Sequence, residues 1–449
     1  SPSTVGGPAS CGAGTPIMNP VDTGTDALTP VQCSSRALLG IVALFPLAFI
    51  AFGLAVDSPR DILEGLIKIQ SSRDTLITDY IGVGGMGAAF VNAGLLTLMA
   101  IGIYHGCGAA IGGAAVACLF LVLGFGLFGK SLANVWFIVA GVYAFARYKR
   151  EPFSRHINVA FFGAALAPIF TEILFSSTLP LHFSLPLAVG TTLLLGFVLV
   201  PTAAHLFSAH MGYSLYNIGW VAGILGTLTV AVYKSHGFVP DPVFIWTTGN
   251  NRLLGALLAG LFVLMLVGGW LLDRQAWHKL AWIQRQAGQS PTDFVALAGM
   301  GPSLMNMGLT GAIGTAYVLA VGGDLNGPTI GAILTIVGFS AFGKHTRNIV
   351  PIMIGVFLAS MFKDWNAHDP SAVLAALFGT TLAPIAGRFG WRWGITAGFL
   401  HSSVAQSVGH LHGGLVLYNN GFAAGLVAAI LVPVIIALRT SGDNEGRAR

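Results

Sequence analysis

Two lysines with matching neighbours are the residues best suited to carry chemistry. Lys130 and Lys344 each follow a Phe-Gly pair. An asparagine comes four residues later in both places, as Asn134 and Asn348. If these segments are helical, lysine and asparagine share one face. A lysine at membrane depth costs roughly 2.5–3.5 kcal/mol. We expect an aqueous pathway, a bound anion or deprotonation to offset this cost, with snorkelling at a helix end as the simpler alternative.

Phenylalanines precede both lysines at the same spacing. They are Phe125 and Phe128 before the first lysine, and Phe339 and Phe342 before the second. Such rings could form apolar constrictions on a solute pathway. Packing in the core or against lipid explains them at least as well.

A histidine pair forms a second candidate group. His210 and His412 lie at corresponding places, and imidazole can relay a proton or donate to a solute near neutral pH. We expect them to meet if both face the boundary between the two parts of the chain. His205, His401 and His410 lie close in sequence, but no carboxylate or cysteine joins them at ligand spacing. The sequence therefore predicts no metal ligands.

A Tyr-Asn pair follows each of these histidines. The pairs are Tyr216-Asn217 and Tyr418-Asn419, and a glycine comes two residues after each asparagine. Phenol and amide groups followed by glycine suit a broken helix whose freed backbone groups line a cavity. We therefore include both pairs in the predicted pathway.

The elements that position these residues are predicted to be transmembrane helices. Of 449 residues, 54% are hydrophobic and 9% are charged, against about 25% charged in soluble domains. Apolar runs approach the ~20 residues that cross a bilayer. They are continuous rather than alternating, which argues against membrane-spanning strands and predicts an all-α polytopic transmembrane bundle. Lysine and arginine lie between these runs, so the net charge of +5 does not indicate a nucleic-acid partner.

The chain repeats itself in four blocks that keep the same order. The first two pair Asp79–Leu95 with Asp293–Leu309, and Gly124–Asn134 with Gly338–Asn348. The next two pair Phe162–Pro168 with Phe378–Pro384, and His210–Gly219 with His412–Gly421. This self-similarity predicts four segments. They are a flexible N-terminal tail (1–35), transmembrane repeat 1 (36–250), transmembrane repeat 2 (251–440) and a C-terminal tail (441–449).

Basic residues indicate that the two repeats are inverted. The loop Arg147–Arg155 carries four basic residues, whereas the equivalent loop near Lys363–Pro370 carries one. One span later the bias reverses, with Arg388 and Arg392 in the second repeat only. Cytoplasmic loops are the basic ones, so equivalent loops should face opposite sides. This predicts an odd number of crossings per repeat, some re-entrant or broken helices, and cytoplasmic termini.

Signatures of catalysis are absent from the sequence. There is no Gly-x-Ser-x-Gly, no His-Glu-x-x-His and no sustained pair of carboxylates. We therefore predict no catalytic residues, no enzyme activity and no cofactor. A membrane-embedded metal site or enzyme built on histidines stays as an alternative.

The motifs also carry a resemblance. Phe339–Asn348 and Leu417–Gly421 resemble an uncharacterised bacterial multi-spanning membrane family, a domain of unknown function, over most of the chain beyond residue 35. The resemblance implies a bacterial cytoplasmic membrane and supplies no substrate. The architecture is loosely similar to urea transporters, but their Leu-Pro-rich signature is missing. The paired histidines resemble those of ammonium channels by analogy alone.

Inverted repeats are typical of transporters and channels, whose site lies where the halves meet. We therefore predict a transporter or channel for a small polar or anionic solute. The alternatives are a urea-like or ammonia-like neutral-solute channel, the histidine-based metal site or enzyme, and a structural membrane protein. The expected partners are the lipid bilayer and the solute, and a homo-oligomer is left open.

Overall fold

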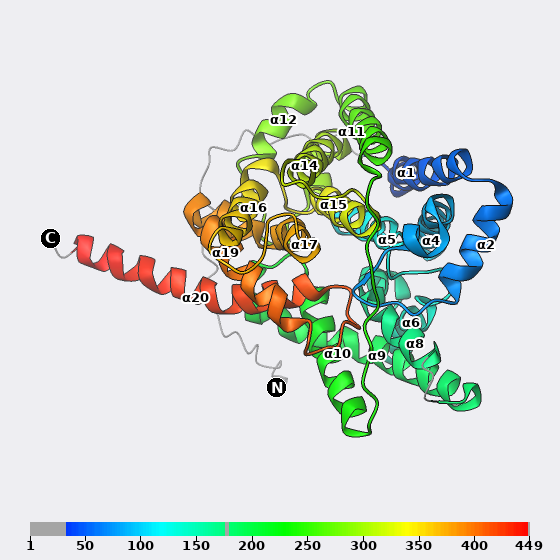
Figure 1. The fold of residues 1–449 in the computed structure, drawn as a ribbon. Coiled ribbons are helices and arrows are strands. Elements are labelled where there is room, and N and C mark those ends of the chain that lie inside the picture. Colours follow the sequence, from blue (N-terminus) through cyan, green and yellow to red (C-terminus); the bar gives the residue numbers. More distant parts are fainter. Residues whose placement is uncertain (1–32, 176–178, 448–449) are drawn as a thin grey trace, which may run out of the picture.

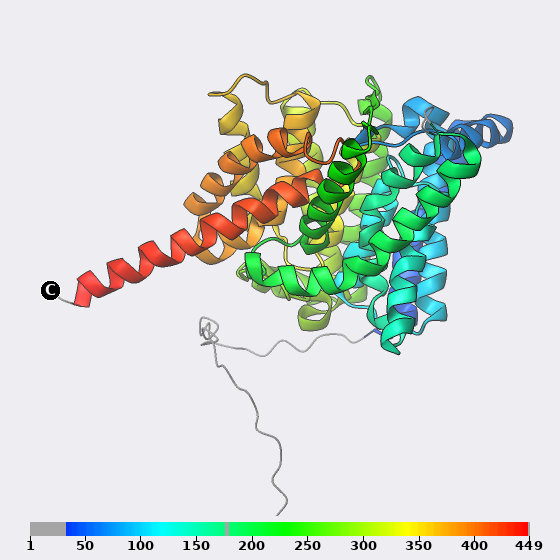
Figure 2. The same ribbon diagram turned by 90° about the horizontal axis from the view of Figure 1, so that it is seen from below.

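The computed structural model describes residues 33–175 and 179–447, with side chains as far as Arg439. The predicted N-terminal tail therefore lies outside the described residues up to residue 32. Helix α20 continues to Arg447, past the end of the second predicted repeat at 440. In Figure 2 this helix extends away from the rest of the bundle.

Helices make up most of the described first half, which also has one short strand pair. The elements in order are α1 (Ser35–Val56), α2 (Pro59–Gln70), β1 (Ile77–Thr78), α3 (Tyr80–Gly84), α4 (Met86–Gly106), α5 (Gly113–Phe125), α6 (Trp136–Lys149), η1 (Phe153–Arg155), α7 (Ile157–Gly163), η2 (Ala164–Leu166), α8 (Ala167–Phe175), α9 (Leu181–His210), α10 (Asn217–Ser235) and β2 (Phe244–Ile245). Strands β1 and β2 pair in parallel.

The described part of the second half repeats this order without a strand and without a counterpart of η1. Its elements are α11 (Asn251–Leu272), α12 (Ala276–Ile283), α13 (Phe294–Ala298), α14 (Met300–Ala320), α15 (Gly327–Phe339), α16 (Thr346–Ser360), α17 (Pro370–Gly379), η3 (Thr380–Leu382), α18 (Ala383–Phe389), α19 (Trp391–Val408) and α20 (Asn419–Arg447).

Eight helical stretches of the described chain are long and apolar enough to cross a membrane. They are Ser35–Val56, Met86–Gly106, Ile157–Phe175, Leu181–His210, Asn217–Ser235, Asn251–Leu272, Pro370–Phe389 and Asn419–Arg439. The prediction of an all-α polytopic transmembrane bundle is confirmed. Two of these stretches, α7–α8 and α17–α18, are interrupted by the 3-10 turns η2 and η3. Proline is the second residue of α8 and α18, where it removes a backbone donor.

Two short helices lie near the middle of the bundle. Helices α5 and α15 have 13 residues each, which corresponds to about 20 Å and is short of the ~30 Å hydrocarbon core. Figure 1 shows them beside each other at the centre. They cross where glycine allows it, since a Cβ atom on Gly124 would lie 2.8 Å from the Gly331 carbonyl oxygen. Helices this short place their ends inside the protein.

A carboxylate from the opposite half holds the N-terminus of each short helix. The Asp293 carboxylate accepts a hydrogen bond from the Gly113 amide at 2.9 Å, at the start of α5. The Asp79 carboxylate accepts one from the Gly327 amide at 3.2 Å, at the start of α15. A negative charge is favourable at a helix N-terminus, where amides are unpaired. The two halves therefore stabilise each other's short helices.

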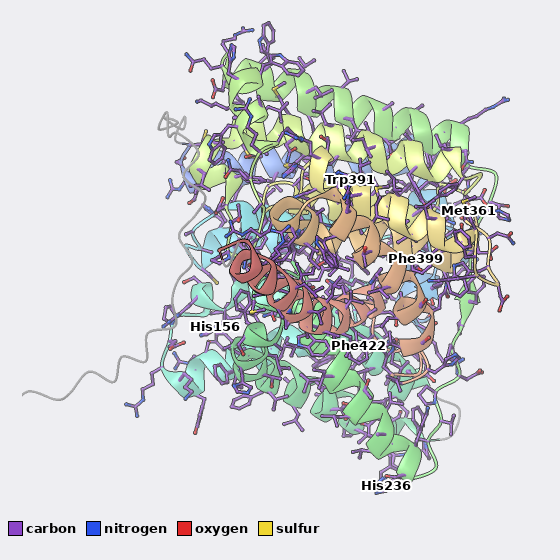
Figure 3. All side chains as sticks on the ribbon, turned by 90° about the vertical axis from the view of Figure 1, so that its left-hand side faces the viewer. His156, His236, Met361, Trp391, Phe399 and Phe422 are labelled. Atoms are coloured by element: carbon purple, nitrogen blue, oxygen red, sulfur yellow. The ribbon has the colours of Figure 1, made fainter. Side chains whose placement is uncertain are left out.

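Corresponding long helices pack against corresponding partners. Helix α1 packs on α4 and α6 on α9, as α11 packs on α14 and α16 on α19. Helices α10 and α20 contact each other across the boundary between the halves. In Figure 3 the labelled Phe422 of α20 lies beside the green helices of the first half. Its ring packs on Trp220 of α10, with 5.7 Å between centroids.

Candidate functional site

The lysines lie in loops that follow the short helices. Helix α5 ends at Phe125, and Lys130 lies in the first lysine loop (126–135). Helix α15 ends at Phe339, and Lys344 lies in the second lysine loop (340–345). Gly129 and Gly343, just before the lysines, have φ of 78° and 132°, which a helix cannot accommodate.

The expectation that lysine and asparagine share a helix face is therefore wrong. Each asparagine side chain instead closes its own loop. The Asn134 amide group donates to the Gly129 carbonyl at 3.1 Å and accepts from the Ser131 amide at 2.9 Å. Asn348 donates to the Gly343 carbonyl at 3.0 Å and accepts from the His345 amide at 2.8 Å. Both side chains hold the backbone that carries the lysine.

Each lysine reaches a tyrosine of the opposite half. The Lys130 ammonium donates to the Tyr418 hydroxyl at 2.7 Å. The Lys344 ammonium donates to the Tyr216 hydroxyl. Both lysine side chains are fully buried, so neither snorkels towards lipid headgroups. The lysine and tyrosine residues predicted for the site are thus brought together, and the pairs cross between the halves.

The remaining contacts of the lysines are neutral. Lys130 also donates to the Phe161 carbonyl at 3.2 Å, and Lys344 to the Thr380 hydroxyl at 2.8 Å. Within the described residues, neither lysine has a carboxylate within 4.0 Å. The Lys344 nitrogen lies 4.5 Å from the centroid of the Tyr216 ring, whose face attracts a cation. The Nζ atoms of both lysines thus have hydrogen bonds but no carboxylate of the described chain beside them.

A cavity of about 210 Å³, the central cavity, lies between the two halves. Its walls are mostly apolar, and they include both tyrosines of the lysine pairs. Its lining residues from equivalent positions are Leu121 and Thr335, Phe125 and Phe339, Phe162 and Phe378, Leu215 and Leu417, Tyr216 and Tyr418, and Gly219 and Gly421. The lysines are not among its lining residues. They contact the hydroxyl groups of the two tyrosines that line it.

Phenylalanines form matching clusters around the tyrosines. Phe125 packs on Tyr418, with 4.9 Å between ring centroids, and Phe339 packs on Tyr216, with 4.7 Å. Phe342 and Phe128 occupy corresponding positions but border different cavities. Phe342 lines the central cavity, and Phe128 lines a second cavity. All of the phenylalanines predicted for the pathway therefore border one of the two cavities.

The second cavity, of about 400 Å³, reaches the loop before β2. Pro240 and Pro242 of this loop line it. It shares three lining residues with the central cavity, namely Phe378, Leu417 and Asn420. These side chains separate the two spaces.

The histidines do not meet between the halves. His210 bonds to Asn217 at 3.0 Å, and His412 bonds to Asn419 at 3.0 Å, each within its own half. Neither histidine is a lining residue of the central cavity, although Asn217 is. The residues that meet between the halves are Gly219 and Gly421. A Cβ atom on Gly421 would lie 2.9 Å from the Gly219 Cα atom. The histidines orient the asparagines beside the cavities.

The other histidines are dispersed. His205 is exposed, His401 bonds to Asn420 at 3.1 Å, and His410 lines the second cavity. No group of three or more His, Cys, Asp or Glu residues in the described part of the chain could hold a metal ion. The alternative of a metal site gains no support.

Sequence reasoning missed several polar residues at the site. Thr380 binds Lys344, and the Thr381 hydroxyl accepts from the Tyr216 amide at 2.9 Å. A signal was available, because this Thr-Thr pair replaces Ala-Ala in the aligned block of the first half. Asp74, which binds Asn134, lies in no repeated block and gave no such signal.

Comparisons with known proteins give one family. A family model described as "Protein of unknown function (DUF1576)" matches residues 58–235 and 272–437. These matches cover more than half of the chain, so the chain belongs to this family. No curated protein and no solved structure gives a significant match.

Proposed function

We propose that this DUF1576 protein is a transporter or channel that moves a small polar or anionic solute through the central cavity, at the boundary of two inverted repeats. The main support for this proposal is the pair of contacts between the halves, Lys130 to Tyr418 and Lys344 to Tyr216. Both tyrosines line the cavity.

The crossed pairs turn the tyrosines into hydrogen-bond donors. A hydroxyl group has one donor hydrogen and two acceptor lone pairs. The oxygen of each tyrosine accepts from an ammonium group, which leaves its own hydrogen for another acceptor. A neighbouring cation strengthens such a donor. Tyr216 and Tyr418 therefore offer a pair of donors to a solute that carries oxygen or negative charge.

The missing countercharge favours an anion. A buried ammonium group without a carboxylate is costly, and an anion in the cavity would offset that cost. Both Lys130 and Lys344 act from behind the cavity wall, where water screens them least. A neutral solute such as urea is the second candidate, since the walls of the cavity are largely apolar.

Equivalent positions support a path with two related ends. Phe128 and Asn419 line the second cavity. Their sequence counterparts, Phe342 and Asn217, line the central cavity. The counterparts of two residues that line the second cavity thus line the central cavity. This is expected if inverted repeats form two entrances. The contacts of the two aspartates with the short helices, and of the two lysines with the tyrosines, likewise occur once in each direction between the halves.

Flux measurements with the full chain in proteoliposomes test this function. The panel is nitrate, lactate and inorganic phosphate as anions, with urea as the neutral solute. We expect uptake of at least one anion, and a tenfold or greater loss in Lys130→Met and Lys344→Met. Lys68→Met changes an exposed lysine of α2 and should behave as wild type.

If a lysine variant fails to fold, Tyr216→Phe and Tyr418→Phe replace it in the test. They remove the hydroxyl group and keep the ring. The absence of uptake for every anion and for urea would contradict the proposal. Urea uptake that is insensitive to the lysine variants would favour the neutral-solute candidate.

A further inference from the structure

A buried carboxylate lies behind the first lysine loop. Asp74, between α2 and β1, is fully buried and lies outside the membrane-spanning helices. The Tyr80 hydroxyl donates to one of its oxygens at 2.8 Å, and the Asn134 amide group donates to the other at 2.9 Å. No lysine, arginine or histidine of the described chain lies within 4.0 Å of it.

Asp74 is connected to the lysine site by one residue. Asn134 binds Asp74 and also closes the loop that carries Lys130. Lys130 in turn binds Tyr418 in the wall of the central cavity. A change in charge at Asp74 therefore acts on the loop whose ammonium group polarises the tyrosine.

The second half has no equivalent carboxylate. Gly288 stands at the corresponding position, 214 residues later, as Asp293 corresponds to Asp79. A Cβ atom on Gly288 would lie 2.0 Å from the Gly343 carbonyl oxygen, so a side chain does not fit there. The site is therefore present once in the molecule, although the lysine–tyrosine pair occurs twice.

Polar groups lead from the surface towards Asp74. The Asp74 amide donates to the Thr171 hydroxyl at 3.1 Å, and the next residue is the buried Glu172. Arg73 lies between Glu172, at 3.7 Å, and the exposed Asp241, at 3.6 Å. The residue after Asp74 in the chain, Thr75, lines the second cavity. Asp74 therefore lies beside polar groups that extend to the surface, and the next residue in the chain borders the second cavity.

The environment of Asp74 favours proton exchange near neutral pH. Its bonded neighbours, Tyr80 and Asn134, are neutral, and they stabilise the ionised form only in part. Burial without a cation disfavours the ionised form of a carboxyl group. Burial raises the pKa of Asp74 from 3.8 to about 7, against the smaller opposing effect of its hydrogen bonds.

We infer that Asp74 is the proton-binding site that couples solute movement to protons, an inference that rests on the proposed function. Protonation of a carboxylate oxygen removes the negative charge behind the loop of Lys130. The positive field at Tyr418 then increases, so the anion and the proton bind together. When the anion leaves on the other side, Asp74 releases its proton. A monovalent anion and one proton carry no net charge.

Uptake of nitrate and lactate under a pH gradient tests this coupling. The full chain is reconstituted with a trapped pH-sensitive dye, at clamped membrane potential. In the wild type, an acidic outer solution should raise anion uptake about tenfold and acidify the lumen in step with it. Asp74→Asn, which is uncharged at every pH, should keep an anion uptake that no longer responds to the gradient and carries no proton. Glu64→Gln, an exposed carboxylate on α2, is the matched control.

Tyr80→Phe is the second variant, should Asp74→Asn fold poorly. It removes a donor that favours the ionised carboxylate, so the pH midpoint of uptake should move upward by up to about one unit. Anion uptake in the wild type that ignores the pH gradient overturns the coupling and leaves the proposed function intact. So does proton uptake that persists in Asp74→Asn. The absence of any solute uptake overturns both.

Discussion

The ammonium group of Lys130 and the hydroxyl group of Tyr418 are 2.7 Å apart, although 288 residues separate them in the chain. The contact crosses from the first half to the second. Lys344 and Tyr216 make the same contact in the opposite direction. A pair of buried lysine–tyrosine contacts thus joins the two halves at the wall of the cavity they enclose.

Tyr418→Phe is expected to destabilise the protein by about 1–3 kcal/mol, because it leaves a charged donor of Lys130 without its partner. Unfolding in detergent followed by tryptophan fluorescence measures this difference. Tyr143→Phe, at an exposed position, should change little. In the double variant with Lys130→Met the cost of Tyr418→Phe should largely vanish. Additive effects would show that the contact contributes nothing to stability.

Asp293→Asn is expected to lower stability by about 1–2 kcal/mol, since it weakens the N-terminus of α5 as well as that of its own helix, α13. Asp79→Asn should have a similar effect through α15. Thermal unfolding in detergent measures both, with Glu64→Gln as the control. A wild-type midpoint for both variants would contradict the crossed capping.

Gly421→Ala is expected to abolish solute flux, because its Cβ atom would meet the Gly219 backbone at 2.9 Å and separate α10 from α20. Overpacking of this kind costs about 1–3 kcal/mol. Gly102→Ala on α4 is the control, since no atom lies within 4 Å of the added carbon. The measurement is flux per folded protein in proteoliposomes. Flux at the wild-type level would place the path away from this contact.

Cysteine labelling tests the inverted arrangement. Arg150 and Asp364 are exposed and correspond to each other in the two halves. In a background with Cys11, Cys33 and Cys107 changed to Ser, Arg150→Cys should react with an impermeant maleimide only from the cytoplasmic side, and Asp364→Cys only from the external side. Labelling of both from one side would show parallel repeats.

The stability of the wild type should fall relative to Asp74→Asn as pH rises. The pKa of Asp74 is raised from 3.8 to about 7 in the folded protein. Its contribution to stability is therefore fully present below pH 3.8 and is lost as pH rises through about 7. Chemical unfolding of both proteins across this range measures the difference. A constant difference would show that Asp74 does not titrate there.

The sequence by itself determined the class of the protein and the residues to inspect. Continuous apolar runs are unstable in water, so composition alone predicts membrane helices. The aligned blocks identified the lysines, the tyrosines and the phenylalanines that border the cavities. Local spacing did not predict the loops correctly, because glycine before each lysine ends the helical path. The asparagines consequently hold the loop backbone.

Only the tertiary structure decided which groups meet. From the sequence, Lys130 could have paired with a tyrosine of either half. In the packed helices it contacts Tyr418 of the second half. The histidines were expected to meet at the boundary, yet the close approach there belongs to Gly219 and Gly421, where the absence of side chains lets the helices touch. Asp74 is buried and bonded to Asn134, a contact that no repeated block of the sequence indicates. Contacts between residues far apart depend on how helices pack, and no local pattern records that packing.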